Sequence, residues 1–394
     1  MDVVVTPEPQ PLPASGAPPS DASPSRKIYL VAAVVLVAVA VGAVLFAGHT
    51  DPNKIAPTVN PNALPVLSPA PAVNPVGGWL NSPPLTPADL AGKVVIYDFW
   101  TYSCINCVRT IPYLAAWNQR YGSDGLVIIG IESPEFDFEK VKSNVVAADA
   151  RLGVTWPVAL DNDMAVWNAF NTEYWPTKDI ADRQGRLRYQ DFGEGQYTQT
   201  EDVIRTLLGV PAGSPRATAP SAAVASANAS GDGDITGETY LGTAMGNEGA
   251  QSGEETYPSP GQPADDTARL GGAWTGESEE VTADTVGSEI VLNYHARQVN
   301  LTLAPPGPPN GAPSNTPPGA PGTPALLRIE LDGQPLPLAD RTSQTMVAAD
   351  GSTYIDVSAD DSYRLVLGSA IQRHTLTLIA LTPGIEAFDF TFGA

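Results

Sequence analysis

The sequence predicts an α/β domain followed by an all-β sandwich or jelly-roll domain, with a single transmembrane helix near the N-terminus. Between residues 77 and 210, apolar runs of strand length alternate with segments of helical spacing, which is typical of a sheet covered by helices on both faces. From residue 237 to 394, short strand-like runs are separated by turn residues instead. Residues 28–47 form a run of twenty residues without a charge, which is long enough to cross a bilayer as a helix.

The N-terminal part is expected to anchor the chain. Residues 1–27 are rich in proline and poor in large apolar side chains, so we expect a disordered cytoplasmic tail. Two basic residues precede the apolar run. Because basic residues stay on the cytoplasmic side, a transmembrane anchor at 28–48 predicts a single-pass protein of the cell membrane with both domains extracytoplasmic. A cleaved signal peptide is the alternative, but residues 45–47 are a poor cleavage site. Residues 49–76 are a Pro-rich linker.

The chain is acidic, with 43 acids against 21 bases and a formal net charge of -22. Nucleic-acid phosphates and anionic lipid both need positive charge on their partner, so the composition argues against both. Glycine and proline contribute 36 and 39 of the 394 residues, which predicts long irregular stretches. We place these in a linker at 211–236 and in a hairpin insertion at 304–325.

The expected elements follow from these patterns. Apolar runs of five to seven residues indicate strands buried on both faces, and apolar residues three and four apart indicate helices. In the first domain we expect strands at 94–100, 126–131 and 156–160 and helices at 110–121, 138–152, 164–170 and 203–208. In the second domain we expect strands at 290–294, 299–303, 326–331, 363–367, 375–381 and 388–392.

The only two cysteines of the chain, Cys104 and Cys107, are three residues apart and follow the strand-like run 94–100. Such a pair on the oxidising side of a membrane points to thiol–disulfide chemistry. We expect Cys104 at the start of a helix, where free backbone N–H groups and the helix dipole lower the pKa of its thiol. Cys104 is then the exposed nucleophile that forms a mixed disulfide, and the more buried Cys107 resolves it.

A static disulfide and half of a zinc site are the alternatives for this pair. Zinc needs four ligands, and His49, His295 and His374 are all far from the cysteines along the chain, so we expect no metal and no other cofactor. A peroxidatic cysteine usually follows a Pro-x-x-x-Thr-x-x-Cys pattern. Thr101 fits that pattern, but Tyr97 stands at the proline position, which excludes a peroxiredoxin.

Asp98 interrupts the apolar run six residues before Cys104. Because burial of a carboxylate is costly, we expect a raised pKa and a role in exchanging a proton with Cys107. A solvated acid at the strand edge is the alternative. Pro176 is predicted to form a cis peptide bond facing the cysteines and to leave the nearby backbone free for an extended substrate strand. The alternative is an ordinary trans turn proline.

Together these residues resemble a thioredoxin fold. Asp98-Phe99-Trp100 followed by Cys104-x-x-Cys107 matches the thioredoxin spacing, as do Pro112 and the run Trp175-Pro176-Thr177. The segment 136–162 resembles the insertion of the TlpA/ResA-like membrane-anchored reductases. The resemblance implies that the substrate-binding residues are Trp100, Trp175, Pro176 and Thr177.

A closer resemblance is to the extracytoplasmic part of DipZ-type proteins, where a β-sandwich resembling a carbohydrate-binding module follows the thioredoxin-like domain. It rests on the runs 100–107, 133–136, 157–163, 192–195, 238–242, 295–297 and 390–393. DipZ-type chains usually begin with a multi-span CcdA-like domain, whereas we expect one anchor here. Electrons would therefore come from a separate CcdA-like membrane donor. The charged pair Lys178-Asp179 also departs from the apolar residues usual after the proline.

The second domain is expected to be a binding module for a glycan or a protein, because no paired carboxylates at a recognisable spacing suggest a glycosidase. Its aromatic residues are more typical of a sandwich core than of a sugar platform: Trp274, Tyr294, Phe388, Phe390 and Phe392. His295 and Arg297 alternate, so they line one face as polar contacts or form a surface pair.

The resemblance implies a membrane-anchored thiol–disulfide oxidoreductase that reduces disulfide-containing envelope proteins of a Gram-positive-type cell. Cytochrome c maturation and envelope redox homeostasis are the expected settings. A disulfide-forming oxidase is an alternative with the same residues, since only the reduction potential separates the two. A non-enzymatic envelope protein that binds glycan or protein is the other alternative.

Overall fold

The computed structural model describes residues 64–218, 220, 235–244, 250–307 and 324–394. All of these residues belong to one compact unit. The expected cytoplasmic tail, the transmembrane anchor and residues 49–63 of the first linker lie outside them, as do most of the second linker and of the proline-rich insertion. Within the described ranges, no helix is both long and apolar enough to cross a membrane.

The first domain is built on a seven-stranded mixed sheet with the order β1-β7-β6-β3-β4-β5-β2. Its strands are β1 (Ser68–Pro69), β2 (Trp79–Leu80), β3 (Val94–Trp100), β4 (Leu126–Glu132), β5 (Val158–Leu160), β6 (Thr177–Ala181) and β7 (Arg186–Phe192). β3, β4 and β5 run parallel, and β6 pairs antiparallel with β3 on its other side. All seven residues of β3 are buried, because this central strand is covered on both faces.

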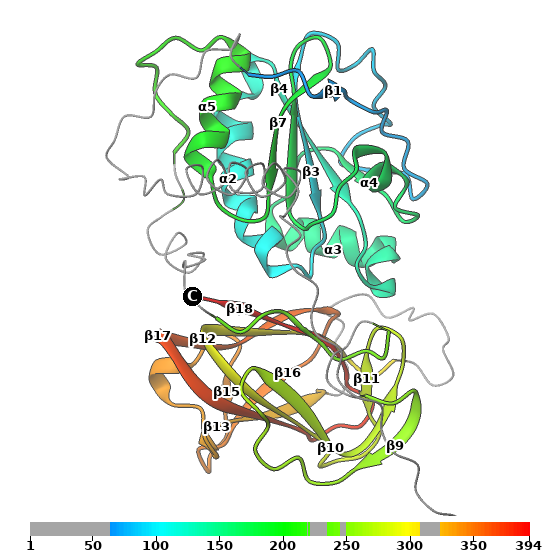
Figure 1. The fold of residues 1–394 in the computed structure, drawn as a ribbon, viewed down its shortest axis with the longest axis vertical. Helices are drawn as coiled ribbons and strands as arrows, with labels where there is room; N and C mark the ends of the chain where they lie inside the picture. The colour runs from blue at the N-terminus through cyan, green and yellow to red at the C-terminus, as the bar shows by residue number, and fades with distance from the viewer. Residues whose placement is uncertain (1–63, 219, 221–234, 245–249, 308–323) are drawn as a thin grey trace, which may run out of the picture. The chain divides into compact units, whose positions relative to one another are not determined.

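Helices cover both faces of this sheet, as the sequence predicts. They are α2 (Ile105–Tyr121), α3 (Lys142–Leu152), α4 (Ala165–Phe170) and α5 (Tyr197–Leu208), with the 3-10 turns η1 (Gly122–Asp124) and η2 (Asp137–Lys140). Side chains of α2, α3 and α5 join one hydrophobic cluster, whereas α4 contributes Trp167 and Phe170 to the cluster on the other face. Figure 1 shows α2 beside α5, with α4 across the sheet from them.

The second domain is an eleven-stranded antiparallel β-structure, which confirms the predicted β-rich region. Its strands are β8 (Thr239–Tyr240), β9 (Gly253–Tyr257), β10 (Thr267–Gly276), β11 (Val281–Ala283), β12 (Glu289–Ala304), β13 (Leu326–Leu331), β14 (Gln334–Pro335), β15 (Met346–Val347), β16 (Thr353–Asp356), β17 (Asp361–Ala380) and β18 (Glu386–Gly393), with the 3-10 turn η3 (Leu338–Asp340). The strand order is β15-β16-β13-β17-β12-β10-β11-β18-β8, with β14 beside β13 and β9 beside β10.

Two pairs of expected strands are continuous in the structure. The runs 290–294 and 299–303 lie in β12. The run 363–367 and all but the last residue of the run 375–381 lie in β17. The two strands stay paired across a register shift between Ala296 and Gln298, because a β-bulge bends a strand without ending it. The first half of β12 pairs with β10 and its second half with β18, so the strand changes partners after the bend.

The core of the second domain contains Trp274, Tyr294, Phe390 and Phe392, as the sequence predicts. The expectation that Phe388 shares this core is wrong. Between the pairs Leu301–Phe390 and Leu303–Ala387, β12 advances two residues and β18 advances three. The extra residue breaks the alternation of side chains, and Phe388 packs instead against Phe136 and Phe138, with ring centroids 5.0 and 4.9 Å away.

Candidate active site

The cysteine pair lies where β3 passes into α2. β3 ends at Trp100, and Cys104 is the residue that precedes the first turn of α2. The backbone N–H of Cys107 donates a hydrogen bond to Sγ of Cys104 at 3.2 Å. Both cysteines are free thiols; Cys107 is fully buried and Cys104 is partly exposed. The difference in exposure matches the predicted order, with an accessible first thiol and a protected second one.

The pKa of the Cys104 thiol is raised well above its ordinary value, mainly by burial. The negative charge of Glu135 raises it further, and the N–H of Cys107 only partly offsets these effects. This direction is opposite to the lowering of the pKa expected at a helix N-terminus, because loss of solvation disfavours the thiolate. Burial also raises the pKa of Cys107.

Asp98 is 2% exposed, in the middle of β3. Burial raises the pKa of its carboxyl to about 7, against a smaller lowering by the charge of Lys178. Oδ1 of Asp98 has no hydrogen-bond partner among the described residues. Its charge raises the pKa of Cys107, so the two groups lie close enough to influence each other. A carboxyl that titrates near neutrality beside the second thiol is suited to exchange a proton with it.

The unusual pair Lys178-Asp179 is fully buried on β6. Lys178 lies opposite Asp98 in the sheet, and its Nζ donates to the Gly193 carbonyl at 3.2 Å and lies 3.3 Å from Oδ2 of Asp191. Burial raises the pKa of Asp179 to about 7. Burial of Lys178 is thus balanced by an ion pair with Asp191, whereas both carboxyl oxygens of the buried Asp179 have no hydrogen-bond partner among the described residues.

Of the four residues expected to contact substrate, Trp175 is half-buried and lines the cleft at Cys104, whereas Trp100, Pro176 and Thr177 are buried. The Trp175–Pro176 peptide bond is cis, as predicted, and the indole N–H of Trp175 donates to the Ser133 carbonyl at 3.0 Å, beside the cysteine loop. Trp100 is 1% exposed in the hydrophobic core. Thr177 is also buried, and its hydroxyl donates to the Tyr174 carbonyl at 2.7 Å. The side chains of Trp100 and Thr177 are thus buried, and contact of these two residues with substrate stays a prediction.

Cys104 opens into a cleft of about 220 Å³ that both domains line. The first domain contributes Ser103, Cys104, Ile105, Asn106, Glu135, Glu173, Tyr174 and Trp175, and the second contributes Glu238, Tyr240, Thr302, Asp389 and Thr391. The residues of the second domain were not predicted from the sequence to lie at this site, although Glu238 and Tyr240 belong to a run that supports the DipZ resemblance. Their approach to the thiol depends on how distant segments fold together.

A buried glutamate organises the loops around Cys104. Glu139 accepts a hydrogen bond from the Ser103 hydroxyl, and its Oε2 accepts the backbone N–H groups of Glu135 and Phe136 at 2.6 and 3.0 Å. Glu135 is thereby held at the cleft, where its Oε1 accepts the hydroxyl of Tyr240 at 2.5 Å. A polar contact and an aromatic cluster therefore both join the second domain to the cysteine loop.

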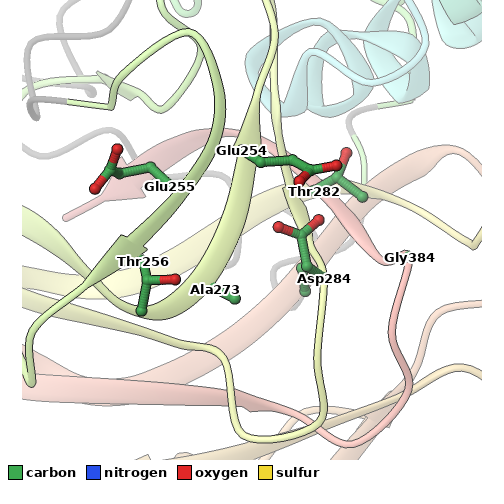
Figure 2. Close-up of a pocket in the computed structure, with 8 residues that line it drawn as sticks. Glu254, Glu255, Thr256, Ala273, Thr282, Asp284 and Gly384 are labelled. Atoms are coloured by element: carbon green, nitrogen blue, oxygen red, sulfur yellow. The ribbon is translucent and has the colours of Figure 1, made fainter.

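A larger cavity of about 720 Å³ lies in the second domain and shares no lining residue with the cleft. Its acidic residues are Glu254 and Glu255 of β9 and Asp284, which follows β11. Figure 2 shows the side chains of Glu254, Thr282 and Asp284 gathered together, with Glu255 directed away from them. Trp274 lies in the core of the second domain, as expected, and its indole N–H donates to the Gly271 carbonyl at 2.9 Å.

Comparison with known proteins follows the two domains. Residues 68–208 match the family described as Redoxin, and residues 236–393 match the family described as thioredoxin like C-terminal domain. Protein DipZ of Mycobacterium bovis is 34% identical over 342 residues, which cover 82% of this chain and 43% of that protein. The chain therefore spans less than half the length of this relative.

Shorter matches cover the first domain alone. Thiol-disulfide oxidoreductase YkuV of Bacillus subtilis is 26% identical over 140 residues, covering 35% of this chain and 94% of YkuV. A solved structure of a thioredoxin-like protein in the oxidised form is 26% identical and covers 36% of this chain and 95% of its own, with a TM-score of 0.34. The chain is thus a homologue of the DipZ proteins that carries a Redoxin domain followed by a thioredoxin-like C-terminal domain.

Proposed function

We propose that this chain is an extracytoplasmic thiol–disulfide oxidoreductase, anchored in the cell membrane by residues 28–48, that reduces disulfides of envelope proteins. The observation that carries the proposal is the arrangement of the two thiols. Cys104 opens into a cleft and accepts the N–H of Cys107, while Cys107 is buried close to the raised-pKa carboxyl of Asp98. Likeness to DipZ and YkuV supports the same chemistry.

The reaction transfers two electrons from the dithiol to the substrate. The Cys104 thiolate attacks one sulfur of the substrate disulfide, the substrate S–S bond breaks, and the departing thiolate takes up a proton. Cys107 loses its proton to Asp98 and attacks Sγ of Cys104. This second exchange releases the other substrate thiol and leaves the Cys104–Cys107 disulfide. An external donor then restores the dithiol, and we propose a separate CcdA-like membrane protein for that step.

Trapping of the mixed disulfide tests this order of events. In Cys107→Ser the intermediate cannot be resolved, so a covalent adduct with a disulfide-containing protein such as insulin should accumulate. Cys104→Ser should give no adduct and no reduction. An adduct through Cys107 in the Cys104→Ser variant, or reduction of insulin without Cys104, would reject the assignment of the nucleophile.

The reduction potential of the Cys104–Cys107 pair tests the direction of electron flow. A value near about -270 mV supports a reductant, whereas a value near about -120 mV makes the chain a disulfide-forming oxidase. Cytochrome c maturation and general protection of exported thiols are the settings that a reductant would serve. A chain without a reversible couple would instead be a non-enzymatic protein that binds glycan or protein.

A further inference from the structure

The cleft above Cys104 is small and acidic. Its volume of about 220 Å³ is below the roughly 300–1,000 Å³ of sites that enclose a drug-sized molecule. It has room for a single long side chain or a small linear disulfide. Because the second domain forms part of its wall, a substrate must bring its sulfur–sulfur bond to Cys104 past the side chains of that domain.

Four acidic residues line this cleft: the exposed Glu173 and, from separate parts of the chain, Glu135, Glu238 and Asp389. None of the salt bridges among the described residues involves them. The charges that act most strongly on Glu135 are those of other carboxylates, namely Asp389, Glu139 and Glu238. Burial and this mutual repulsion raise the pKa of Asp389 to about 8.

Asp389 provides an independent indication that something else binds here. The residue is 3% exposed and lines the cleft. Its carboxyl has side-chain hydrogen bonds with Thr302 and Glu238, but its Oδ1 has no partner among the described residues. A buried polar atom without a partner costs free energy that a ligand donor can recover. A cation fits best, because it would supply hydrogen-bond donors and would stabilise the ionised forms of Glu135, Glu238 and Asp389, which burial and mutual repulsion disfavour.

We propose that the cleft selects disulfides that carry a positively charged group next to the sulfur–sulfur bond, with Glu135, Glu238 and Asp389 binding that group. The inference rests on the proposed function, because Cys104 lines the same cleft and must attack the sulfur beside the bound cation. The charged group is an ammonium of a small disulfide or a Lys or Arg side chain adjoining a protein disulfide. Anionic disulfides are disfavoured, since the ionised forms of the acids in the cleft repel their charge.

The test uses the reduced full chain and three disulfides of similar size. These are cystamine, which is cationic, bis(2-hydroxyethyl) disulfide, which is neutral, and dithiodiglycolate, which is anionic. The rate constant for oxidation of the Cys104–Cys107 pair is measured with each and divided by the rate constant with dithiothreitol, which removes differences in intrinsic reactivity. We expect cystamine to exceed the neutral disulfide by about tenfold, as for a hydrogen-bonded charge, and the anion to fall below it.

Two amide variants locate the effect. Asp389→Asn and Glu238→Gln should each lower the ratio of cystamine to neutral disulfide toward one. The matched controls are Asp284→Asn and Glu254→Gln in the larger cavity (Figure 2), which change the net charge equally and should keep the wild-type ratio. Because each cleft variant has its own control, failure of one variant to fold leaves the other to decide.

The outcomes separate this inference from the proposed function. Three outcomes would overturn the inference and leave the oxidoreductase function intact. They are a ratio of cystamine to neutral disulfide near one in the wild type, an unchanged ratio in both cleft variants, and an equal fall of the ratio in the control variants. If no disulfide oxidises the protein, the proposed function itself fails. A matched pair of disulfide peptides, with Arg or Gln beside each cysteine, distinguishes the sources: a preference for the Arg peptide assigns protein substrates, and a preference for cystamine alone assigns small cationic disulfides.

Discussion

Substitution of Asp98 by Asn gives a prediction whose size follows from the structure. Burial raises the pKa of Asp98 from 3.8 to about 7 in the folded protein, whereas the unfolded chain keeps the ordinary value. Between pH 3.8 and about 7, the carboxyl of Asp98 is ionised in the unfolded chain but protonated in the folded protein. The wild-type protein therefore loses stability as the pH rises through this range. The difference of roughly three pKa units corresponds to about 4 kcal/mol by pH 8. Below pH 4 both states are protonated and the contribution vanishes.

The amide that replaces the carboxyl in Asp98→Asn cannot ionise, so the variant should escape this loss. We expect the free energy of unfolding of Asp98→Asn, minus that of the wild type, to rise by about 4 kcal/mol from pH 4 to pH 8. A new buried amide adds a cost of about 1–3 kcal/mol, but that cost does not depend on pH. The slope is therefore the diagnostic quantity.

Urea denaturation of both proteins at several pH values measures this slope, and the values near pH 4 act as an internal control. The other buried acids titrate in both proteins, so their contribution cancels in the difference between the two free energies of unfolding. A difference that stays constant across the range would mean that Asp98 ionises as in the unfolded chain. The account of Asp98 as a proton acceptor for Cys107 would then be refuted.

Two further predictions concern the thiol and the buried lysine. Because the pKa of Cys104 is raised, the rate of its alkylation by iodoacetamide should still increase above pH 9. Glu135→Gln removes a negative charge that raises this pKa, so the variant should be alkylated faster than the wild type at the same pH. An alkylation rate that is already constant from pH 7 upward would contradict the raised pKa. Lys178→Met should lower the free energy of unfolding by about 3–5 kcal/mol, because it leaves Asp191 buried without its ionic partner. The double variant Lys178→Met/Asp191→Leu should regain part of this free energy in urea denaturation. If the double variant is as unstable as Lys178→Met, the ion pair is not the cause of the loss.

Much of the first domain could be predicted because its signals are local. The apolar run 94–100 makes a buried strand wherever it lies in a sheet, and the acid inside it is buried with the strand. Cys104 and Cys107 follow that strand directly, so their place at the start of a helix depends only on neighbouring residues. The boundaries were less accurate, as in α2 and α5, because helix ends depend on tertiary packing as well as on spacing.

The second domain shows where local signals stop. A β-bulge and a turn both interrupt an alternating pattern, so the run 290–303 could not be recognised as the single strand β12. A register shift in β18 likewise places Phe388 outside the domain core, where it packs against Phe136. Neither event leaves a distinct mark in the sequence, since the pairing partner decides which residue becomes the extra one.

The sequence by itself determined the chemistry, with two thiols at a fixed spacing, an acid in the strand before them and a proline loop that matches a known pattern. Only the tertiary structure decided the environment of that chemistry: the direction of the pKa shift at Cys104, the ion pair of Lys178, and the acids of the second domain that line the same cleft as Cys104. The physical reason is that spacing along the chain fixes which groups are neighbours in one strand or helix turn. Solvation and charge at a site depend instead on every segment that packs against it.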